Sequence, residues 1–240
     1  MTKTPFRKRC LLLFIFSLVL ISVFLVVKNK FDLSKFFKIQ KIKVEKIVKY
    51  FPFSTENSLN EWEEKVLKGK VVYRIERGAT FSHVKAESSK AASALYYRVK
   101  MDAGRNPVIS WKWRVWKFPE KSLPEKIEDT KEEDFAARVY VIFPAAFFTN
   151  SKVVEYIWSE TLPAGTWGIS GYSKNIRVLV LETGKSDEWI FEKRDIVEDY
   201  VKLFGEKPRL NVGAISFMTD ADSTKTSALA VYDEITIGYE

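Results

Sequence analysis

The stretch VISWKWRVW, residues 108–116, decides the fold class, because its side chains alternate in polarity. In an extended chain one face carries Ile109, Trp111, Trp113 and Val115. The opposite face carries Ser110, Lys112, Arg114 and Trp116. A period of two is typical of a β-strand that packs one face against a core. The stretch therefore predicts a half-buried strand.

The same alternation recurs from residue 51 to the end of the chain. Further strands are predicted at VVYRIE 71–76, ALYYRVK 94–100, FAARVYVIF 135–143, VVEYIW 153–158, IRVLVLE 176–182, LNVGAISFM 210–218 and SALAVYDEITIGY 227–239. Turn residues separate them, and almost no helical pattern intervenes. A series of short strands of this kind predicts a mostly β domain over residues 51–240, an antiparallel β-sandwich or jelly roll.

One short α-helix is predicted near residues 195–204. Its apolar residues recur at helical spacing at Ile196, Val197, Tyr200, Val201 and Phe204. Asp195 can cap the first turn, and Gly205 followed by Pro208 ends the helix.

The N-terminus carries the run LLLFIFSLVLISVFLVV, residues 11–27, which has no charged residue. As a helix it would span roughly 26 Å, near the thickness of a bilayer core. A secretory signal would end in a small-x-small cleavage site, whereas this run ends in LVVKNKF. The sequence thus predicts an uncleaved N-terminal transmembrane helix, a signal anchor in the lipid bilayer.

The flanks of this helix suggest an orientation. Residues 1–10 form a basic N-terminus that we expect on the cytoplasmic side, because RKR at residues 7–9 abuts the apolar run. Residues 28–50 form a basic juxtamembrane stalk, either solvated or lying on anionic headgroups. We expect a single-pass protein of the bacterial inner (cytoplasmic) membrane with its domain in the periplasm.

Charge distribution argues against nucleic acid as a partner. The net charge is +8, but residues 1–50 hold twelve Lys and Arg against two acids, and the remaining residues hold 27 against 29. The globular part is therefore slightly acidic and lacks the basic character of a nucleic-acid-binding domain.

The segment FMTDADSTKT, residues 217–226, places Asp220 and Asp222 after an apolar strand. It has the letters of a phosphotransferase motif, but only eighteen residues follow Asp222 and no α/β domain can be built from them. An EF-hand fails because Lys225 occupies the glycine position and Val231 the bidentate glutamate position. A polar loop remains, with Ca²⁺ binding completed from other loops as an alternative.

The segment LETGKS and the residue His83 are both expected to have structural and not functional roles. LETGKS, residues 181–186, lacks the first glycine of a phosphate-binding loop and predicts a hairpin turn. His83 is the only histidine, so multi-histidine metal sites are excluded, and we expect a surface or hydrogen-bonded core histidine.

Trp116 is the main candidate for ligand binding. By alternation it shares a face with Lys112 and Arg114 and is joined by Phe118. An exposed aromatic ring beside cations suits stacking on a sugar. The alternative is that a second layer, or the helix near 195–204, covers this face. Acids for general acid-base work are also plentiful, at Glu132, Glu133, Asp134, Glu182 and Glu192.

Several stretches together resemble an uncharacterised bacterial family, domain of unknown function 3047. They are FPFSTENSLNEWEE, SWKWRV, EEDFAARVYVIF, YIWSE, WIFEKRDIVEDYVKLFGEKP and MTDADSTKTSALAVYDEI. The resemblance implies that Asp134, Arg138, Arg194, Asp199, Asp220 and Asp222 stand at motif positions. It brings no activity.

A looser similarity links the chain to jelly-roll carbohydrate-binding modules, which open with a Phe-rich strand and close on a strand such as YDEITI. In those modules an opening acid and a closing Asp can share a structural Ca²⁺. The similarity thus implies Glu56 and Asp233 as ligands of such an ion.

These observations favour a membrane-anchored β-sandwich that binds a glycan or another cell-envelope ligand without catalysis. The expected ligand-binding residues are Lys112, Arg114, Trp116, Asp134, Arg138, Asp220 and Asp222. One alternative is a jelly-roll polysaccharide hydrolase or lyase that uses carboxylates near Asp134 and Asp220. Another is a scaffold that recruits an envelope protein.

Overall fold

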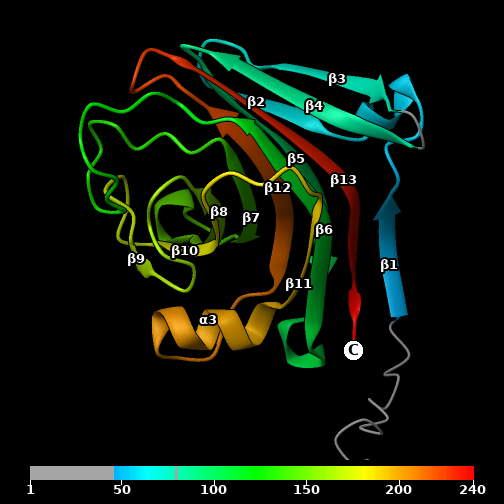
Figure 1. The fold of residues 1–240 in the computed structure, drawn as a ribbon. Helices are drawn as coiled ribbons and strands as arrows, with labels where there is room; N and C mark the ends of the chain where they lie inside the picture. The colour runs from blue at the N-terminus through cyan, green and yellow to red at the C-terminus, as the bar shows by residue number, and fades with distance from the viewer. Residues whose placement is uncertain (1–45, 79–80) are drawn as a thin grey trace, which may run out of the picture. The chain divides into compact units, whose positions relative to one another are not determined.

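A computed structural model describes residues 46–78 and 81–240, which form two packed β-sheets (Figure 1). The six-stranded sheet has the order β11-β6-β13-β4-β3, and β1 pairs with β13 as well. Its strands are β1 Lys46–Phe51, β3 Val72–Arg77, β4 Ser82–Ser89, β6 Pro107–Lys117, β11 Ile190–Asp195 and β13 Ser227–Tyr239. The expected transmembrane helix, residues 11–27, lies outside the described residues.

The seven-stranded sheet has the order β2-β5-β12-β7-β8-β10-β9. Its strands are β2 Glu63–Lys68, β5 Ala92–Met101, β7 Ala137–Phe143, β8 Lys152–Ser159, β9 Trp167–Ile169, β10 Ile176–Thr183 and β12 Val212–Asp220. Short 3-10 turns lie at Glu56–Leu59, Ala103–Arg105 and Phe148–Asn150. The mostly β, two-sheet sandwich predicted from the sequence is confirmed.

The core lies between the sheets and follows the alternation of the opening stretch. Trp111 and Trp113 of β6 are fully buried. Trp111 packs on Tyr156, and Trp113 on Trp158, with ring centroids 5.4 and 5.7 Å apart. Since both partners belong to β8 of the other sheet, the intervening residues of β6 point away from the core.

The predicted helix is confirmed as α3, Ile196–Phe204. Asp195 accepts hydrogen bonds from the amides of Val197 and Glu198, both at 2.9 Å, and Gly205 closes the helix at φ 72°. The helix contacts β6 and β11 of one sheet and β8 of the other, and Figure 1 shows it across one end of the sandwich. It therefore leaves the outward face of β6 open.

Three expectations from the sequence need correction. The sheets are not wholly antiparallel, because β10 runs parallel to β8 while β9 pairs antiparallel to β10 at the edge. LETGKS is not a hairpin turn, because β10 and β11 belong to different sheets and the segment crosses between them. Residues 46–50, assigned to the stalk, belong to edge strand β1, where Ile47 and Val48 supply the β-branched character.

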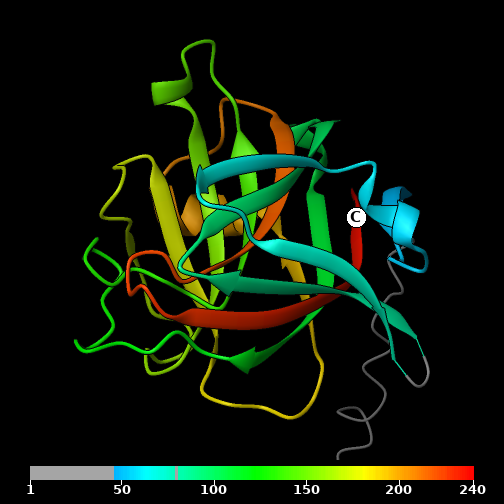
Figure 2. The same cartoon turned by 90° about the horizontal axis from the view of Figure 1, so that it is seen from above.

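A long loop, residues 118–136, folds over the outer face of the seven-stranded sheet (Figure 2). Ile127 and Phe135 of the loop are buried in a second apolar cluster with Ile157, Val178 and Val180. The loop thereby covers β8 and β10 and seals charged side chains of β7 and β8 from water.

Among the residues that the structure describes, no helix has the length and apolar character needed to cross a bilayer.

Candidate functional site

The expected ligand-binding residues fall into two separate groups. Lys112, Arg114 and Trp116 lie on the outer face of the six-stranded sheet, the face turned away from the seven-stranded sheet. Asp134 belongs to the 118–136 loop, and Arg138, Asp220 and Asp222 lie beneath and beside this loop at the other sheet. The two groups offer different chemistry.

Trp116 is exposed over 43% of its surface, as its place on the outer face predicts. Lys85 of β4 lies 5.4 Å from the centre of the Trp116 ring and the Arg114 guanidinium 5.8 Å from it, both at cation–π distance. Phe118, expected on this face, is instead buried in the core because β6 ends at Lys117.

The rings of Phe81, His83, Trp116 and Trp189 form an aromatic cluster on this face. His83 is central, with ring centroids 6.3, 6.0 and 5.4 Å from those of Phe81, Trp116 and Trp189. Both of its ring nitrogens are buried without a hydrogen-bond partner among the described residues. Burial lowers the pKa of His83 and keeps the ring neutral. His83 is therefore neither the surface histidine nor the hydrogen-bonded one that we expected.

A hollow of about 180 Å³ opens beside Trp116. It is lined by Arg114, Val115, Trp116, Lys185, Ser186 and Asp187. Residues 185–187 belong to the segment that crosses from β10 to β11, so this wall comes from a part of the chain that is distant from β6 in sequence. The sequence predicted the β6 wall, but it could not place the second wall because the crossing depends on tertiary topology. We call this hollow the Trp116 pocket.

The second group is built around Arg138 of β7, which is 3% exposed. Its Nε and Nη2 donate to Oδ1 and Oδ2 of Asp220 at 3.1 and 2.9 Å, and Nη1 donates to Glu155 at 2.6 Å. The carbonyl of Glu133 accepts a further bond from Nη2. One buried guanidinium thus holds strands β7, β8 and β12 together.

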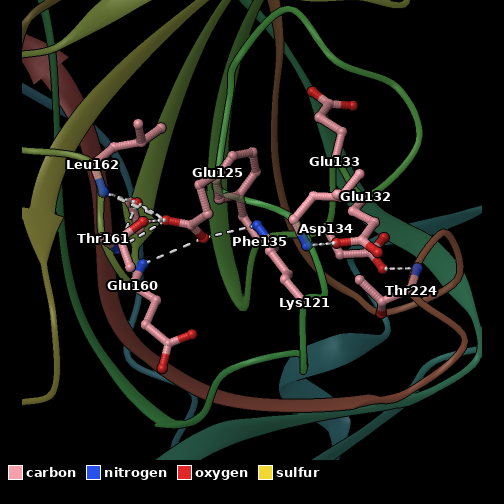
Figure 3. Close-up of polar contacts among 12 residues, drawn as sticks. Lys121, Glu125, Glu132, Glu133, Asp134, Phe135, Glu160, Thr161, Leu162 and Thr224 are labelled. Carbon is pink, nitrogen blue, oxygen red and sulfur yellow. Dashed lines mark hydrogen bonds and ion pairs between the residues drawn. The ribbon is translucent and has the colours of Figure 1, made fainter.

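Asp134 and Asp222 lie next to this cluster. Asp134 accepts hydrogen bonds from the amides of Ser223 and Thr224 at 3.2 and 2.6 Å and so fixes the turn after β12 (Figure 3). Asp222 pairs with the exposed Lys68 at 3.2 Å. One oxygen from each of Asp134, Asp220 and Asp222 lies within 4.8 Å of the others, so this group could hold a metal ion.

Glu133 differs from its neighbours. It is 2% exposed, and neither carboxyl oxygen has a hydrogen-bond partner among the described residues, although Arg138 Nη1 lies 3.6 Å away. Burial raises the pKa of Glu133 to about 8, against the opposing charge of Arg138. The carboxyl group is therefore largely protonated at neutral pH. In the sequence Glu133 is one of several candidate acids, and no local pattern indicates that it is buried.

Glu56 and Asp233, the Ca²⁺ ligands implied by the jelly-roll similarity, lie in different settings. Glu56 is exposed on the 3-10 turn Glu56–Leu59, whereas Asp233 is buried on β13 opposite Lys112. Burial raises the pKa of Asp233 to about 6. Neither residue belongs to a group of three acids close enough to share an ion within the described part of the chain.

A second arginine–aspartate pair lies at the helix end of the sandwich. Arg194 donates from Nε to Oδ2 of Asp199 at 2.8 Å, and the hydroxyl of Tyr156 donates to the same oxygen at 2.8 Å. The six motif positions therefore include two buried or half-buried Arg–Asp pairs, Arg138–Asp220 and Arg194–Asp199. Both pairs join elements of the fold to one another.

The 118–136 loop is fastened by Glu125. Its carboxylate accepts from Lys121 Nζ at 2.7 Å, from the amide of Thr161 at 2.8 Å and from the hydroxyl of Ser159 (Figure 3). Burial alone would raise the pKa of Glu125, but the charge of Lys121 and these hydrogen bonds outweigh it and lower the pKa to about 2. The carboxylate stays ionised and holds the loop against the end of β8.

Sequence comparison connects this architecture with a family. Residues 60–236 match the model of a family described as protein of unknown function (DUF3047), a span that includes both groups of candidate residues. The chain belongs to the DUF3047 family. No curated protein has a matching sequence. In this DUF3047 protein the resemblance noted from the motifs is thus confirmed.

Solved structures share the β-sandwich arrangement of this DUF3047 protein. The family 11 carbohydrate-binding module from Clostridium thermocellum has 14% sequence identity and a TM-score of 0.41, covering 80% of this chain and 94% of the module. The CBM22-1 xylan-binding domain from Paenibacillus barcinonensis Xyn10C has 12% identity and a TM-score of 0.41, covering 82% and 96%. A cellulase derived from Cel12A of Rhodothermus marinus has 8% identity and a TM-score of 0.45, covering 75% and 97%. The likeness concerns the β-sandwich arrangement alone.

Proposed function

We propose that this protein binds a glycan of the cell envelope through the Trp116 pocket, without catalysis. One observation carries the proposal: an exposed tryptophan and a hollow of about 180 Å³ lie together on an open sheet face. Sites for small ligands combine apolar walls with a few polar groups that fix orientation. The Trp116 pocket supplies the aromatic wall through Trp116 and is richer in polar groups than such sites usually are, with Arg114, Lys185, Ser186 and Asp187 in its lining.

The chemistry of the pocket suits a sugar ring. Trp116 offers an aromatic face for the apolar C–H side of a pyranose, while Ser186 and Asp187 offer groups that hydrogen bond with hydroxyls. The aromatic cluster limits rotation of the indole, because His83 and Lys85 pack against it. A platform held in place loses little conformational entropy when the ligand binds.

We also propose a cellular location for the protein. The uncharged run of residues 11–27 would anchor the chain in the bacterial inner membrane, with the β-sandwich in the periplasm. A domain held there would meet polysaccharide at high local concentration, so a single small pocket of modest affinity would suffice.

We further propose that the metal ion held by the aspartate group is Ca²⁺. The group Asp134, Asp220 and Asp222 offers only oxygen ligands, which suit a hard cation. Arg138 already pairs with both oxygens of Asp220, so the ion would depend mainly on Asp134 and Asp222. We therefore propose weak, millimolar binding of the kind found in extracellular modules.

A glycan array tests the function, with the full-length chain in detergent micelles as the probe. Trp116→Ala should abolish binding to the glycans that the wild type retains. Trp167→Ala is the matched control, because Trp167 is 48% exposed but lies on β9 of the other sheet. The proposal is wrong if no glycan is retained or if the two variants bind equally.

A second candidate, a polysaccharide hydrolase or lyase, rests on the carboxyl pair of Glu182 and Glu192. Burial, with a hydrogen bond and repulsion from Glu182, raises the pKa of Glu192 to about 8. A carboxyl group kept protonated beside a second acid suits general acid catalysis. Asp134 and Asp220 suit this role less, since their oxygens already accept hydrogen bonds from backbone amides.

Release of reducing ends or unsaturated products from a polysaccharide panel tests this candidate. Activity should disappear in Glu192→Gln and persist in Glu188→Gln, which alters an exposed neighbour. Inertness on every substrate, or full activity in Glu192→Gln, counts against catalysis.

A further inference from the structure

Arg114 is the residue of the Trp116 pocket that holds a buried hydrogen-bond donor without an acceptor in the described part of the chain. Its Nε is buried and has no acceptor among the described residues. Its ion pair with Asp187 is long, 3.6 Å from Nη2 to Oδ1, and Asp187 is fully exposed. A buried donor without a partner is costly unless a ligand or solvent supplies the acceptor.

The neighbouring cations of the outer face are already paired. Lys85 lies 3.1 Å from Glu76, and Lys112 lies 2.8 Å from Glu234. Lys185, in the opposite wall of the pocket, has no ion pair with any described residue. The pocket lining therefore contains two cations, Arg114 and Lys185, against the single carboxylate of Asp187.

This excess of positive charge in the pocket favours an anionic ligand. A guanidinium presents a planar fork of donors that matches a carboxylate or a phosphate, and charge-assisted bonds to such groups are the strong ones. A neutral sugar would leave the Nε donor of Arg114 with only a hydroxyl and would leave the excess positive charge uncompensated.

We propose that the ligand of the Trp116 pocket is an acidic saccharide, whose carboxylate or phosphate binds Arg114 while its ring stacks on Trp116. This inference rests on the proposed glycan binding and specifies its substrate class. The pocket volume of about 180 Å³ is below the roughly 300–1,000 Å³ of sites for drug-sized ligands. It therefore takes a single acidic sugar unit of a longer polymer.

The test compares pairs of polymers that share a sugar backbone and differ in whether they carry the acidic group. Polygalacturonate and its full methyl ester share the same ring, but only the first carries carboxylates; phosphomannan and mannan form a matching phosphate pair. Affinity of the full-length chain in micelles is measured for all four by titration at low and high salt. The acidic member of a pair should bind at least tenfold more tightly, and salt should weaken that binding. The pair that shows the difference identifies the acidic group.

Variants assign the effect to Arg114. Arg114→Gln should lower affinity for the acidic polymer at least tenfold and leave any affinity for its neutral partner within twofold. Arg98→Gln, on the seven-stranded sheet, removes an exposed cation and should change neither. Equal melting temperatures of the two variants show that both fold.

Each result decides a separate claim. Equal binding of acidic and neutral polymers, or acidic binding that persists in Arg114→Gln, overturns the acidic ligand and leaves glycan binding intact. Absence of binding to all four polymers and to every glycan on the array overturns both.

Discussion

The guanidinium of Arg138 forms two hydrogen bonds with the carboxylate of Asp220, from Nε to Oδ1 at 3.1 Å and from Nη2 to Oδ2 at 2.9 Å. Both side chains are buried, and the contact joins β7 to the end of β12. The Asp-x-Asp segment that looked catalytic in the sequence therefore begins with a residue that stabilises the sheet. Burial raises the pKa of Asp220 to about 7, even though Arg138 opposes the shift.

Asp220→Asn should strongly destabilise the domain. The amide group would turn a donor toward Arg138 and leave part of a buried positive charge uncompensated, which costs about 3–5 kcal/mol. In a domain of this size that corresponds to a fall in melting temperature of about 10 °C. Thermal unfolding at pH 8, followed by circular dichroism, measures it.

Asp222→Asn is the matched control for that experiment. Among the described residues Asp222 forms its ion pair with Lys68, whose side chain is largely exposed, so the change should cost less than about 1 kcal/mol. Similar losses in the two variants would show that the Arg138 contact has no special weight.

Domain stability should decrease from pH 6.5 to pH 8.5. Burial raises the pKa values of Glu133 and Glu192 to about 8 and that of Asp220 to about 7, so in this range the folded state holds protons that the unfolded state has released. Stability therefore falls as pH rises toward 8. His83, with its lowered pKa, has the opposite effect, which falls mainly below this range. Melting temperatures across the range measure the slope.

Glu133→Gln and Glu192→Gln should flatten this pH dependence, because a neutral side chain replaces a group that must ionise. Glu63→Gln, an exposed carboxylate with a lowered pKa, should leave the slope unchanged. A melting temperature that is constant or rises between pH 6.5 and 8.5 would contradict the assignment.

Millimolar Ca²⁺ should raise the melting temperature by a few degrees, and EDTA should reverse the rise, because an ion that binds only the folded state stabilises it. Asp222→Asn should remove the effect while leaving the metal-free melting temperature nearly unchanged. A rise that persists in Asp222→Asn would place the ion away from the Asp134, Asp220 and Asp222 group.

Local sequence pattern predicted the elements whose signals are local. The alternation around Trp111 and Trp113, and the cap and stop of α3 at Asp195 and Gly205, gave a strand and a helix within one or two residues of their bounds. β2, β4, β9 and β11 were missed. β2 and β11 are charged, exposed or half-buried edge strands with no apolar face, β9 has only three residues, and β4 reads SHVKAESS, with Val84 and Ala86 as its apolar residues.

The candidate site, like the fold, was only partly predictable from the sequence. Alternation placed Trp116 on the outward face of β6 but left open whether another layer covers that face, and the second pocket wall at residues 185–187 depends on a crossing between sheets. Arg138 and Asp220 are 82 positions apart in the sequence, and Glu133 is buried because the long loop that contains it packs on the sheet. Single-sequence periodicity contains no information about such contacts.

Glu125→Gln should loosen the 118–136 loop without unfolding the sandwich. The change removes the charge that pairs with Lys121, and an amide cannot accept all of the bonds that reach this carboxylate from Ser159 and Thr161. Amide hydrogen exchange should accelerate in residues 118–136 and 159–162 and stay unchanged in α3. Glu120→Gln serves as the control, since its side chain is 78% exposed. Equal acceleration throughout the chain would mean that Glu125 supports the whole fold, and no acceleration would mean that Ile127 and Phe135 hold the loop by apolar burial alone.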